Sequence, residues 1–377
     1  RGNELSDGAD LFLALLELLP WLKDIFISDG SELRLVDGAA TAYNQGDTCK
    51  GPAGTCQKKI HGFLSARSQS LVDVSITKGT GAERPEVPVE KLAFCLWLAD
   101  AGYIDFDIFK EIAESHGYYV VRGRQDMNPM VRSITTYSPE GEIIKHEELS
   151  EPTPLKELAP TLDNKCSYDM QVTLRNDHEC RVIRSYVPDC DSSNRSAKAK
   201  RRNEHKDGFA YFYTNLSPEQ FDLHQIIALY RVRWSIEIFW KVQKSFNGLK
   251  AERLLKNSVI HALIKLSLAC QALKTLVAQM VEPLLGGKRL SLLQVAAHSG
   301  TVVMEALEHV LGKCCNFEML DISARKLMWN FSRRVKRTPS KVNREKGKGV
   351  YCSIKELKRP AKTVAGLLRT SSPPSAA

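Results

Sequence analysis

The sequence predicts a mixed α/β fold, followed by a β-rich segment and then by a helical segment with a basic end. Three observations predict it. Up to residue 124, short runs of branched apolar residues alternate with helical periodicity, which is typical of a mixed sheet. Residues 125–213 have the alternating pattern of strands joined by polar loops. From residue 214 onward, apolar residues recur with helical spacing.

The most apolar early run is LFLALLELLPWL at 11–22, which is too short to span a bilayer and contains Glu17 and Pro20. It lacks a cationic leader, so we expect a buried amphipathic helix and no signal peptide. Because the first residue is Arg and not Met, we interpret the chain as an N-terminally truncated fragment. Residues 1–30 are then the remnant of an N-terminal helical region.

Residues 31–124 are expected to form the first part of the core. Two aspartates stand where strands end, Asp37 and Asp100, and carboxylates at strand ends are what an active site on an open sheet needs. Singly, such residues are ordinary turn residues. We expect strands at 32–43, 58–66, 70–77, 95–103 and 118–124, a helix entry at 85–94 and a helix at 106–117.

Residues 125–213 are expected to form a β-rich insertion with a basic loop, AKAKRRNEHK. The helical segment 214–320 begins at NLSPEQ, where Ser217 can be the N-cap, Pro218 the first helical residue and Gln220 the end of a capping box. This helix should run to about Phe246. Two further long helices are expected at 259–285 and 290–311.

The first of these helices contains YRVRWSIEIFWKVQK, in which five polar residues fall on one stripe about 80° wide. Bulky apolar residues, including Trp234 and Trp240, flank the stripe on both sides, which predicts a partly buried, charged groove. Ordinary surface ion pairs at i,i+4 would not explain the tryptophans. The stripe consists of Tyr230, Arg233, Glu237, Lys241 and Lys244.

The net charge of +9 belongs almost wholly to residues 321–377, which hold 15 Lys and Arg against 3 Asp and Glu. Such a patch favours a polyanion, because each neutralised phosphate releases counterions. The alternative is a solvated tail. The ten cysteines form no C-x-x-C pair, which indicates reduced thiols in a cytoplasmic protein. The candidate DNA-contacting residues of this segment are Arg333, Arg334, Lys336 and Arg337.

Three carboxylates, Asp37, Asp100 and Glu237, come from separate elements. If they converge without His or Cys, they make a hard oxygen site suited to Mg²⁺ or Mn²⁺. Two such ions could activate a nucleophile and stabilise the leaving oxygen in a phosphoryl displacement. The sequence therefore predicts a catalytic metal site at these three residues.

The spacing Tyr230-x2-Arg233-x3-Glu237-x6-Lys244 resembles the Y-x2-R-x3-E-x6-K signature of bacterial insertion-sequence DDE transposases, the insertion-sequence-four family. RLVDG around Asp37 and LADAGYIDFDIF around Asp100 resemble the blocks that carry the family's two aspartates. YYVVRGR resembles the strand that closes the second block. The resemblance covers about residues 30 to 285.

This resemblance implies a ribonuclease-H-like core with a β-rich insertion before the catalytic helix. It implies that Asp37, Asp100 and Glu237 hold two divalent metals, and that Tyr230, Arg233 and Lys244 contact phosphates of the transposon end. The enzyme would cleave double-stranded DNA at the terminal repeats and join the 3′-hydroxyl to target DNA. We expect a homodimer in the synaptic complex, no membrane partner, and a bacterial, nucleoid-associated location. We expect most of the family's N-terminal repeat-recognition region to be absent.

Two alternatives remain open. The chain could be a non-catalytic transposase-derived relic or inhibitor that binds DNA through its basic segment. The intact acidic triad argues against that reading, and the missing start argues for it. It could also be a ribonuclease-H-like nuclease, although plain hydrolysis does not need the long polar stripe beyond Glu237.

Overall fold

The structure is a computed structural model, and it describes residues 15–17, 19–34, 57–79, 81–124, 126–163, 165–186, 209–246, 249, 257–281 and 362. The chain divides into two compact units. The first unit comprises Arg1–Ser28, Glu83–Arg233 and Val350–Ala377, and the second comprises Asp29–Ala82 and Trp234–Gly349. Strand β1 (Ile25–Arg34) belongs to both, because the boundary falls between Ser28 and Asp29.

In the first unit the strands are hydrogen bonded in the order β1-β4-β5-β10-β9-β8-β6-β7. The pairs β1–β4 and β4–β5 are parallel, and the remaining pairs are antiparallel. The strands are β4 (Leu96–Ala99), β5 (Tyr118–Arg122), β6 (Met130–Tyr137), β7 (Ile143–Pro154), β8 (Ser167–Thr173), β9 (Glu179–Tyr186) and β10 (Phe209–Thr214).

The parallel strands form the buried centre of this unit. All four residues of β4 are buried, as expected for a strand with parallel neighbours on both sides. Helix α3 (Phe106–Glu114) begins at the N-cap Asp105 and packs on β5, where the rings of Phe109 and Tyr119 stack with centroids 4.4 Å apart. The predicted strand, helix and strand between 95 and 124 are confirmed.

The helix entry predicted at 85–94 is wrong. The segment forms two 3₁₀ turns, η1 (Arg84–Glu86) and η2 (Val89–Lys91). Pro85 and Pro88 explain the difference, because proline donates no backbone hydrogen bond and disfavours helical geometry in the residue before it.

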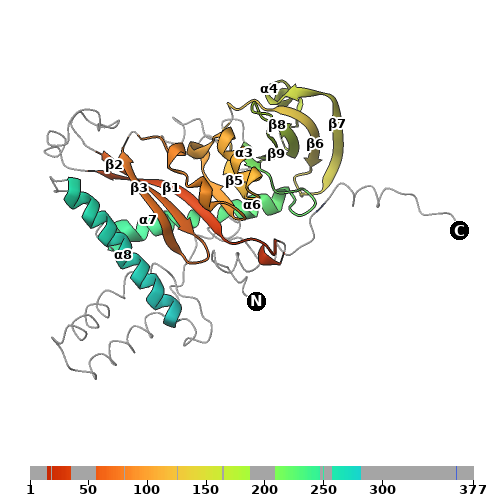
Figure 1. Ribbon diagram of the computed structural model, residues 1–377. Coiled ribbons are helices and arrows are strands. Elements are labelled where there is room, and N and C mark those ends of the chain that lie inside the picture. Colours follow the sequence, from red (N-terminus) through yellow and green to blue (C-terminus); the bar gives the residue numbers. More distant parts are fainter. Residues whose placement is uncertain are drawn as a thin grey trace, which may run out of the picture. The chain divides into compact units, whose positions relative to one another are not determined.

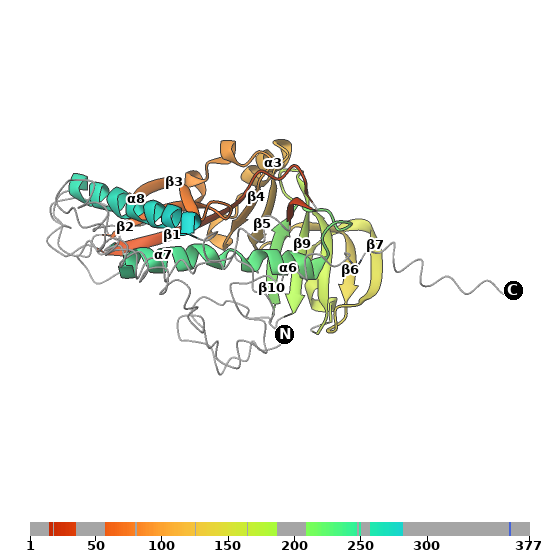
Figure 2. The same ribbon diagram turned by 90° about the horizontal axis from the view of Figure 1, so that it is seen from below.

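The second unit contains the β2–β3 hairpin, which continues the sheet beside β1. Strands β2 (Gln57–Ser65) and β3 (Ser70–Lys78) pair antiparallel and confirm the strands predicted there. Helix α8 (Asn257–Val281) packs against β3 and α7 (Trp234–Phe246), as Figures 1 and 2 both show. Followed through β1, the strand order 3-2-1-4-5 is the ribonuclease-H-like order.

The helix predicted from Ser217 to Phe246 begins later. Residues 218–220 form a turn, and α6 (Leu223–Arg231) is capped by Asp222, which forms the capping box with Gln225. The predicted cap at Ser217 is therefore wrong. The carboxylate of Asp222 accepts from the amides of both His224 and Gln225 (3.0 Å each), so it satisfies two amides at the helix start.

That predicted helix is also interrupted at Val232 and Arg233. The amides of these two residues donate to carbonyl oxygens three residues back, Leu229 and Tyr230, at 3.1 and 3.0 Å. This tighter 3₁₀ pattern ends α6 before α7 begins at Trp234. The five polar residues of the predicted stripe therefore lie on two helices and the turn between them.

Several predicted features lie outside the described residues. They include Asp37 and most of the strand expected at 32–43, the helix expected at 290–311, and the basic segment with Arg333, Arg334, Lys336 and Arg337. Among the described residues, β1 begins at Ile25, earlier than predicted. Of the helices that are described, none has the length and apolar character to cross a membrane.

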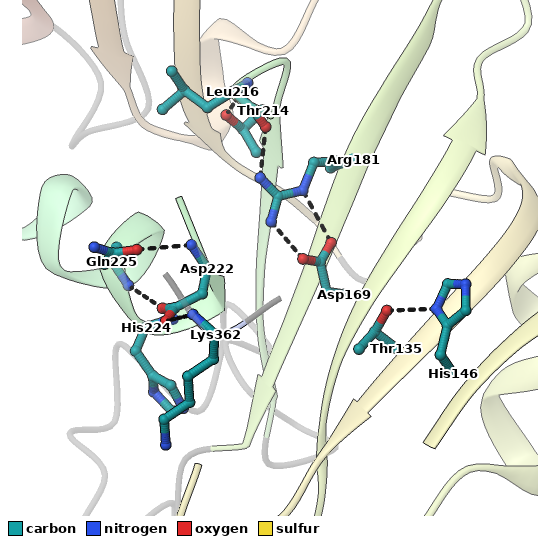
Figure 3. A network of polar contacts seen from close by, with 10 residues as sticks. All are labelled: Thr135, His146, Asp169, Arg181, Thr214, Leu216, Asp222, His224, Gln225 and Lys362. Atoms are coloured by element: carbon teal, nitrogen blue, oxygen red, sulfur yellow. Dashed lines mark hydrogen bonds and ion pairs between the residues drawn. The ribbon is translucent and has the colours of Figure 1, made fainter. Parts of the chain in front are cut away.

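A buried ion pair holds the β-rich segment to the start of the helical segment (Figure 3). Arg181 on β9 forms a bidentate pair with Asp169 on β8, and both side chains are at most 5% exposed. The same guanidinium donates to the carbonyl of Leu216 at 2.5 Å. The Asp169 carboxylate and the Leu216 carbonyl both accept hydrogen bonds from the Arg181 guanidinium. These bonds offset the cost of burying the two charges.

Asp169→Ala would leave the Arg181 guanidinium buried without its counter-charge. We expect the free energy of unfolding to fall by about 3–5 kcal/mol, as measured by urea denaturation. The control is the exposed pair between Arg132 and Glu179, 2.5 Å apart, which joins β6 to β9. Glu179→Ala should cost less than about 1 kcal/mol. Equal losses in the two variants would contradict this account.

Candidate active site

Asp100 is positioned by the end of the buried strand β4. It caps the 3₁₀ turn η3 (Ala101–Tyr103), and its carboxylate accepts from the amide of Gly102 at 2.8 Å. The side chain is half-buried, and Tyr103 beyond it is buried. The carboxylate thus lies at the carboxyl end of a parallel strand, where open α/β sheets bind their ligands.

A second carboxylate, that of Glu83, lies beside this turn. A Cβ atom placed on Gly102 would come 2.1 Å from Glu83 Oε2 and 3.1 Å from Asp100 Oδ1. The absence of a side chain at 102 therefore lets the Glu83 carboxylate approach the Asp100 turn. Sequence reasoning missed Glu83, because it precedes a proline-containing segment that was interpreted as a helix entry.

Tyr230, in the last turn of α6, belongs to the same surroundings. Its ring packs on Phe212 of β10 with centroids 4.8 Å apart, and the side chain is 9% exposed. Burial raises the pKa of Tyr230 to about 12; the positive charges of Arg233 and Arg122 oppose that rise, and the negative charge of Asp100 adds to it. The phenol is therefore neutral at physiological pH and can donate a hydrogen bond.

Within the part of the chain that is described, the Tyr230 hydroxyl has no hydrogen-bond partner of normal geometry. A buried hydroxyl left in this state costs roughly 1–3 kcal/mol, which an acceptor oxygen from a ligand would remove. Arg233 is buried as well, and its guanidinium lies 5.8 Å from the Tyr230 ring. The first unit thus gathers Asp100, Arg122, Tyr230 and Arg233, a carboxylate among donors that suit phosphate oxygens.

The second unit carries the other predicted site residues on α7. Glu237 is half-buried in its first turns, and Lys241 is exposed one turn further on. Burial lowers the pKa of Lys244, while the carboxylates of Glu32 and Asp29 on β1 oppose that shift. Lys244 therefore lies near the negative charges of β1.

The two tryptophans that flank these residues have different environments. Trp240 is buried against β2, where a Cβ on Gly62 would come 2.6 Å from Trp240 Cζ2. Glycine at 62 is required by this close approach of helix to strand. Trp234 is 49% exposed at the start of α7 and has a free surface for contact.

Asp29 is a candidate that sequence reasoning missed. It is half-buried within β1, two residues beyond Ile27, which is the last β1 residue paired in register with β4. Asp100 is likewise two residues beyond Leu98, the β4 partner of Ile27. The signal in the sequence is the run IFISDGS, an apolar strand start that leads into an aspartate. It went unnoticed because RLVDG, eight residues later, fitted the expected block.

Taken singly, Asp100, Glu83, Asp29 and Glu237 each offer only oxygen atoms, the kind of ligand that hard divalent ions prefer. Within the described residues, no group of three or more His, Cys, Asp or Glu side chains is close enough to hold a metal ion. The four cysteines that are described, Cys95, Cys166, Cys180 and Cys270, are free thiols.

Comparison with known proteins gives one family match. The family model described as "Transposase DDE domain" matches residues 20–273, which is more than half of the chain. No curated protein matches the sequence. Among solved structures, the chain is similar to a piggyBac transposase in a synaptic complex with hairpin DNA, with 11% identity and a TM-score of 0.45. That match covers 90% of this chain and 65% of the piggyBac chain.

The close approach of Glu83 to Gly102 predicts coupling between these positions. Gly102→Ala should lower the free energy of unfolding by less than about 1 kcal/mol, because the new methyl group has only to displace the end of the flexible Glu83 side chain at an exposed turn. In the double variant with Glu83→Ala the collision is gone, so the two effects should fall short of additivity by roughly 0.5 kcal/mol. Thermal and urea denaturation of the four proteins measure this coupling. Additive losses would show that the two residues do not meet.

Proposed function

Because this chain belongs to the transposase DDE domain family, we propose that it is a DNA transposase of the insertion-sequence-four type. It cleaves DNA at transposon ends and transfers the freed 3′-hydroxyl into target DNA. The observation that carries the proposal is the gathering of Asp100 with Tyr230, Arg233 and Arg122 at the end of β4 and β5. Among the described residues the buried Tyr230 hydroxyl has no acceptor for its proton, and a phosphate oxygen would supply one.

The proposed metal ligands are carboxylates. Asp100 and Glu237 are two of them, and the third comes from the β1 region, where Asp37 was expected and Asp29 is the alternative. When bound there, two Mg²⁺ or Mn²⁺ ions supply the charge that polarises the reacting phosphate and activates its nucleophile. The half-buried positions of Asp100 and Glu237 keep their carboxylates accessible from solvent.

The remaining residues of the proposed site bind and orient DNA. The neutral Tyr230 hydroxyl donates to a phosphate oxygen and so acquires its missing acceptor. Arg233 holds a phosphate through its planar guanidinium, a geometry that lysine lacks. Lys241 and Lys244 contact the backbone further along, and Arg333, Arg334, Lys336 and Arg337 extend the contact from the basic segment. Trp234 offers an exposed ring for stacking against a base.

Of the two β1-region candidates, the observations favour Asp29. It lies on β1 two residues past Ile27, as Asp100 lies two residues past Leu98, the β4 partner of Ile27. The charge of Asp29 acts on Lys244, which lies two turns after Glu237 on the same helix. We therefore propose Asp29 as the third carboxylate, which requires Asp29, Asp100 and Glu237 to come closer together when metal and DNA bind than they are in this structure. The transposase is proposed to act as a homodimer on double-stranded DNA in the bacterial cytoplasm.

Glu237→Gln and Asp100→Asn should each lower Mg²⁺-dependent cleavage of end-bearing DNA by at least about 10²-fold, because each removes a proposed metal ligand. DNA binding should persist in a filter-binding assay. Asp107→Asn, an exposed residue of α3, is the matched control and should cleave normally. Binding without cleavage by the unaltered protein would favour the relic or inhibitor. Cleavage without joining of a pre-cut 3′-hydroxyl end would favour a nuclease.

Asp29→Asn and Asp37→Asn separate the two candidates for the third carboxylate. We expect Asp29→Asn to abolish Mg²⁺ uptake in titration calorimetry together with cleavage, and Asp37→Asn to retain both. Circular dichroism establishes that each variant is folded. If only Asp37→Asn loses metal uptake and cleavage, then Asp37 is the third carboxylate, as the sequence suggested.

A further inference from the structure

Strand β9 carries two buried arginines whose charges are compensated differently. Arg181 and Arg184 are 2% and 3% exposed, and because they are three residues apart, their side chains lie on opposite faces of the sheet. Arg181 has the carboxylate of Asp169 as a bidentate partner (Figure 3). Within the part of the chain that the structure describes, no carboxylate pairs with Arg184, and its buried Nη1 has no hydrogen-bond partner.

Aromatic side chains lie around the Arg184 guanidinium. Its register partners on the neighbouring strands are Tyr168 on β8 and Tyr211 on β10. The guanidinium carbon lies 3.6 Å from the centroid of the Phe209 ring and 5.6 Å from that of the Tyr168 ring. Arg184 Nε donates to the Tyr211 hydroxyl at 3.1 Å. Ring faces attract a cation, but they do not replace a charged acceptor for the remaining N–H groups.

This arrangement leaves a permanent charge buried without an anion among the described residues. Arginine does not lose its proton in proteins, so Arg184 cannot become neutral as a buried lysine can. Burying an ion is costly unless an opposite charge and hydrogen bonds compensate it, and the two stacked rings and one phenol compensate only part of that cost. The group that is missing at Nη1 is an acceptor that carries negative charge.

We propose that Arg184 binds a small free oxyanion of the phosphate type, at a site formed with Tyr168, Phe209 and Tyr211. A phosphate accepts hydrogen bonds from two N–H groups of one guanidinium at once. Because Nε is engaged by Tyr211, the anion binds at the Nη atoms, where Nη1 needs an acceptor. A side chain that is 3% exposed does not lie along a DNA backbone, which meets only the protein surface. A small anion enters when the nearby end of β9 opens locally.

This anion site is separate from the proposed catalytic site. Tyr211 and Phe212 are adjacent on β10, so their side chains lie on opposite faces of the sheet. Phe212 packs on Tyr230, whereas Tyr211 bonds to Arg184. The bound anion is therefore not the phosphate of the proposed reaction, and the proposal does not depend on transposase activity.

Thermal unfolding in inorganic phosphate tests the proposal. Phosphate should raise the Tm of the unaltered chain by a few degrees relative to chloride at the same ionic strength, because a ligand bound only by the folded state stabilises it. Arg184→Met should abolish this rise, and unlike the loss of Arg181 it leaves no buried carboxylate without its partner. Arg132→Met, at an exposed arginine of β6, is the matched control and should retain the rise.

A second variant keeps the positive charge and measures binding directly. Arg184→Lys loses the planar fork, so titration calorimetry with inorganic phosphate should show binding at least about tenfold weaker than in the unaltered chain. This variant also decides the question if circular dichroism shows that Arg184→Met does not fold. Equal phosphate binding in Arg184→Lys and the unaltered chain, or a phosphate-dependent rise in Tm that survives in Arg184→Met, would overturn the proposal. Stabilisation by a phosphorylated oligonucleotide but not by inorganic phosphate would also overturn it.

Discussion

The parallel pairing of β1, β4 and β5 is the constraint on which the first unit depends. Parallel strands carry their carboxyl ends to one edge of a sheet, and burial on both faces makes them nearly continuous apolar runs. The β4 sequence LWLA satisfies that requirement, and the first polar residue after it is Asp100. The position of this carboxylate therefore follows from the burial of the strand before it. Arg122 has the corresponding position at the end of β5.

Burial away from water determines the protonation state of Tyr230, near the edge of the sheet where Asp100 lies. Tyr230 is held neutral because burial penalises the phenolate more than the nearby arginines stabilise it. A neutral phenol and a permanently charged guanidinium are both donors, so the surroundings of Asp100 combine one acceptor group with donors that suit an anion. Phosphodiester oxygens satisfy such donors, and a carboxylate alone would repel the phosphate. That repulsion is the physical reason for proposing a cation between Asp100 and DNA.

The sequence predicted the elements whose pattern is local. Strands β2, β3, β5 and helix α3 occur where they were expected, because side-chain alternation and helical periodicity are properties of short segments. The errors arose where two nearby residues could each cap a helix, and where no local signal marks the end of a helix. Ser217 and Asp222 are both suitable caps, and only the tertiary fold, which buries Asp222, favours the later one. No proline or glycine near Val232 and Arg233 indicates the break in the helix there.

The candidate site residues differ in how they can be found. Asp100 and Glu237 can be proposed from the sequence alone because each is embedded in a distinctive spacing, whereas Glu83 and Asp29 become candidates only through their positions in the folded chain. Glu83 reaches the Asp100 turn only because position 102 lacks a side chain. Asp29 is followed by glycine and serine, a typical turn signal, yet β1 continues through it to Arg34. Pairing with neighbouring strands outweighed the local preference.

The polar contact between α7 and α8 connects the second unit to the proposed chemistry. Gln243 lies next to Lys244 and two turns beyond Glu237, and its carboxamide is fully buried and bonded to Ser267. Rotating α8 about its axis would break that bond and leave Gln243 Oε1 without this donor in the interior. The orientation of α8 is therefore fixed by the same helix that carries Glu237.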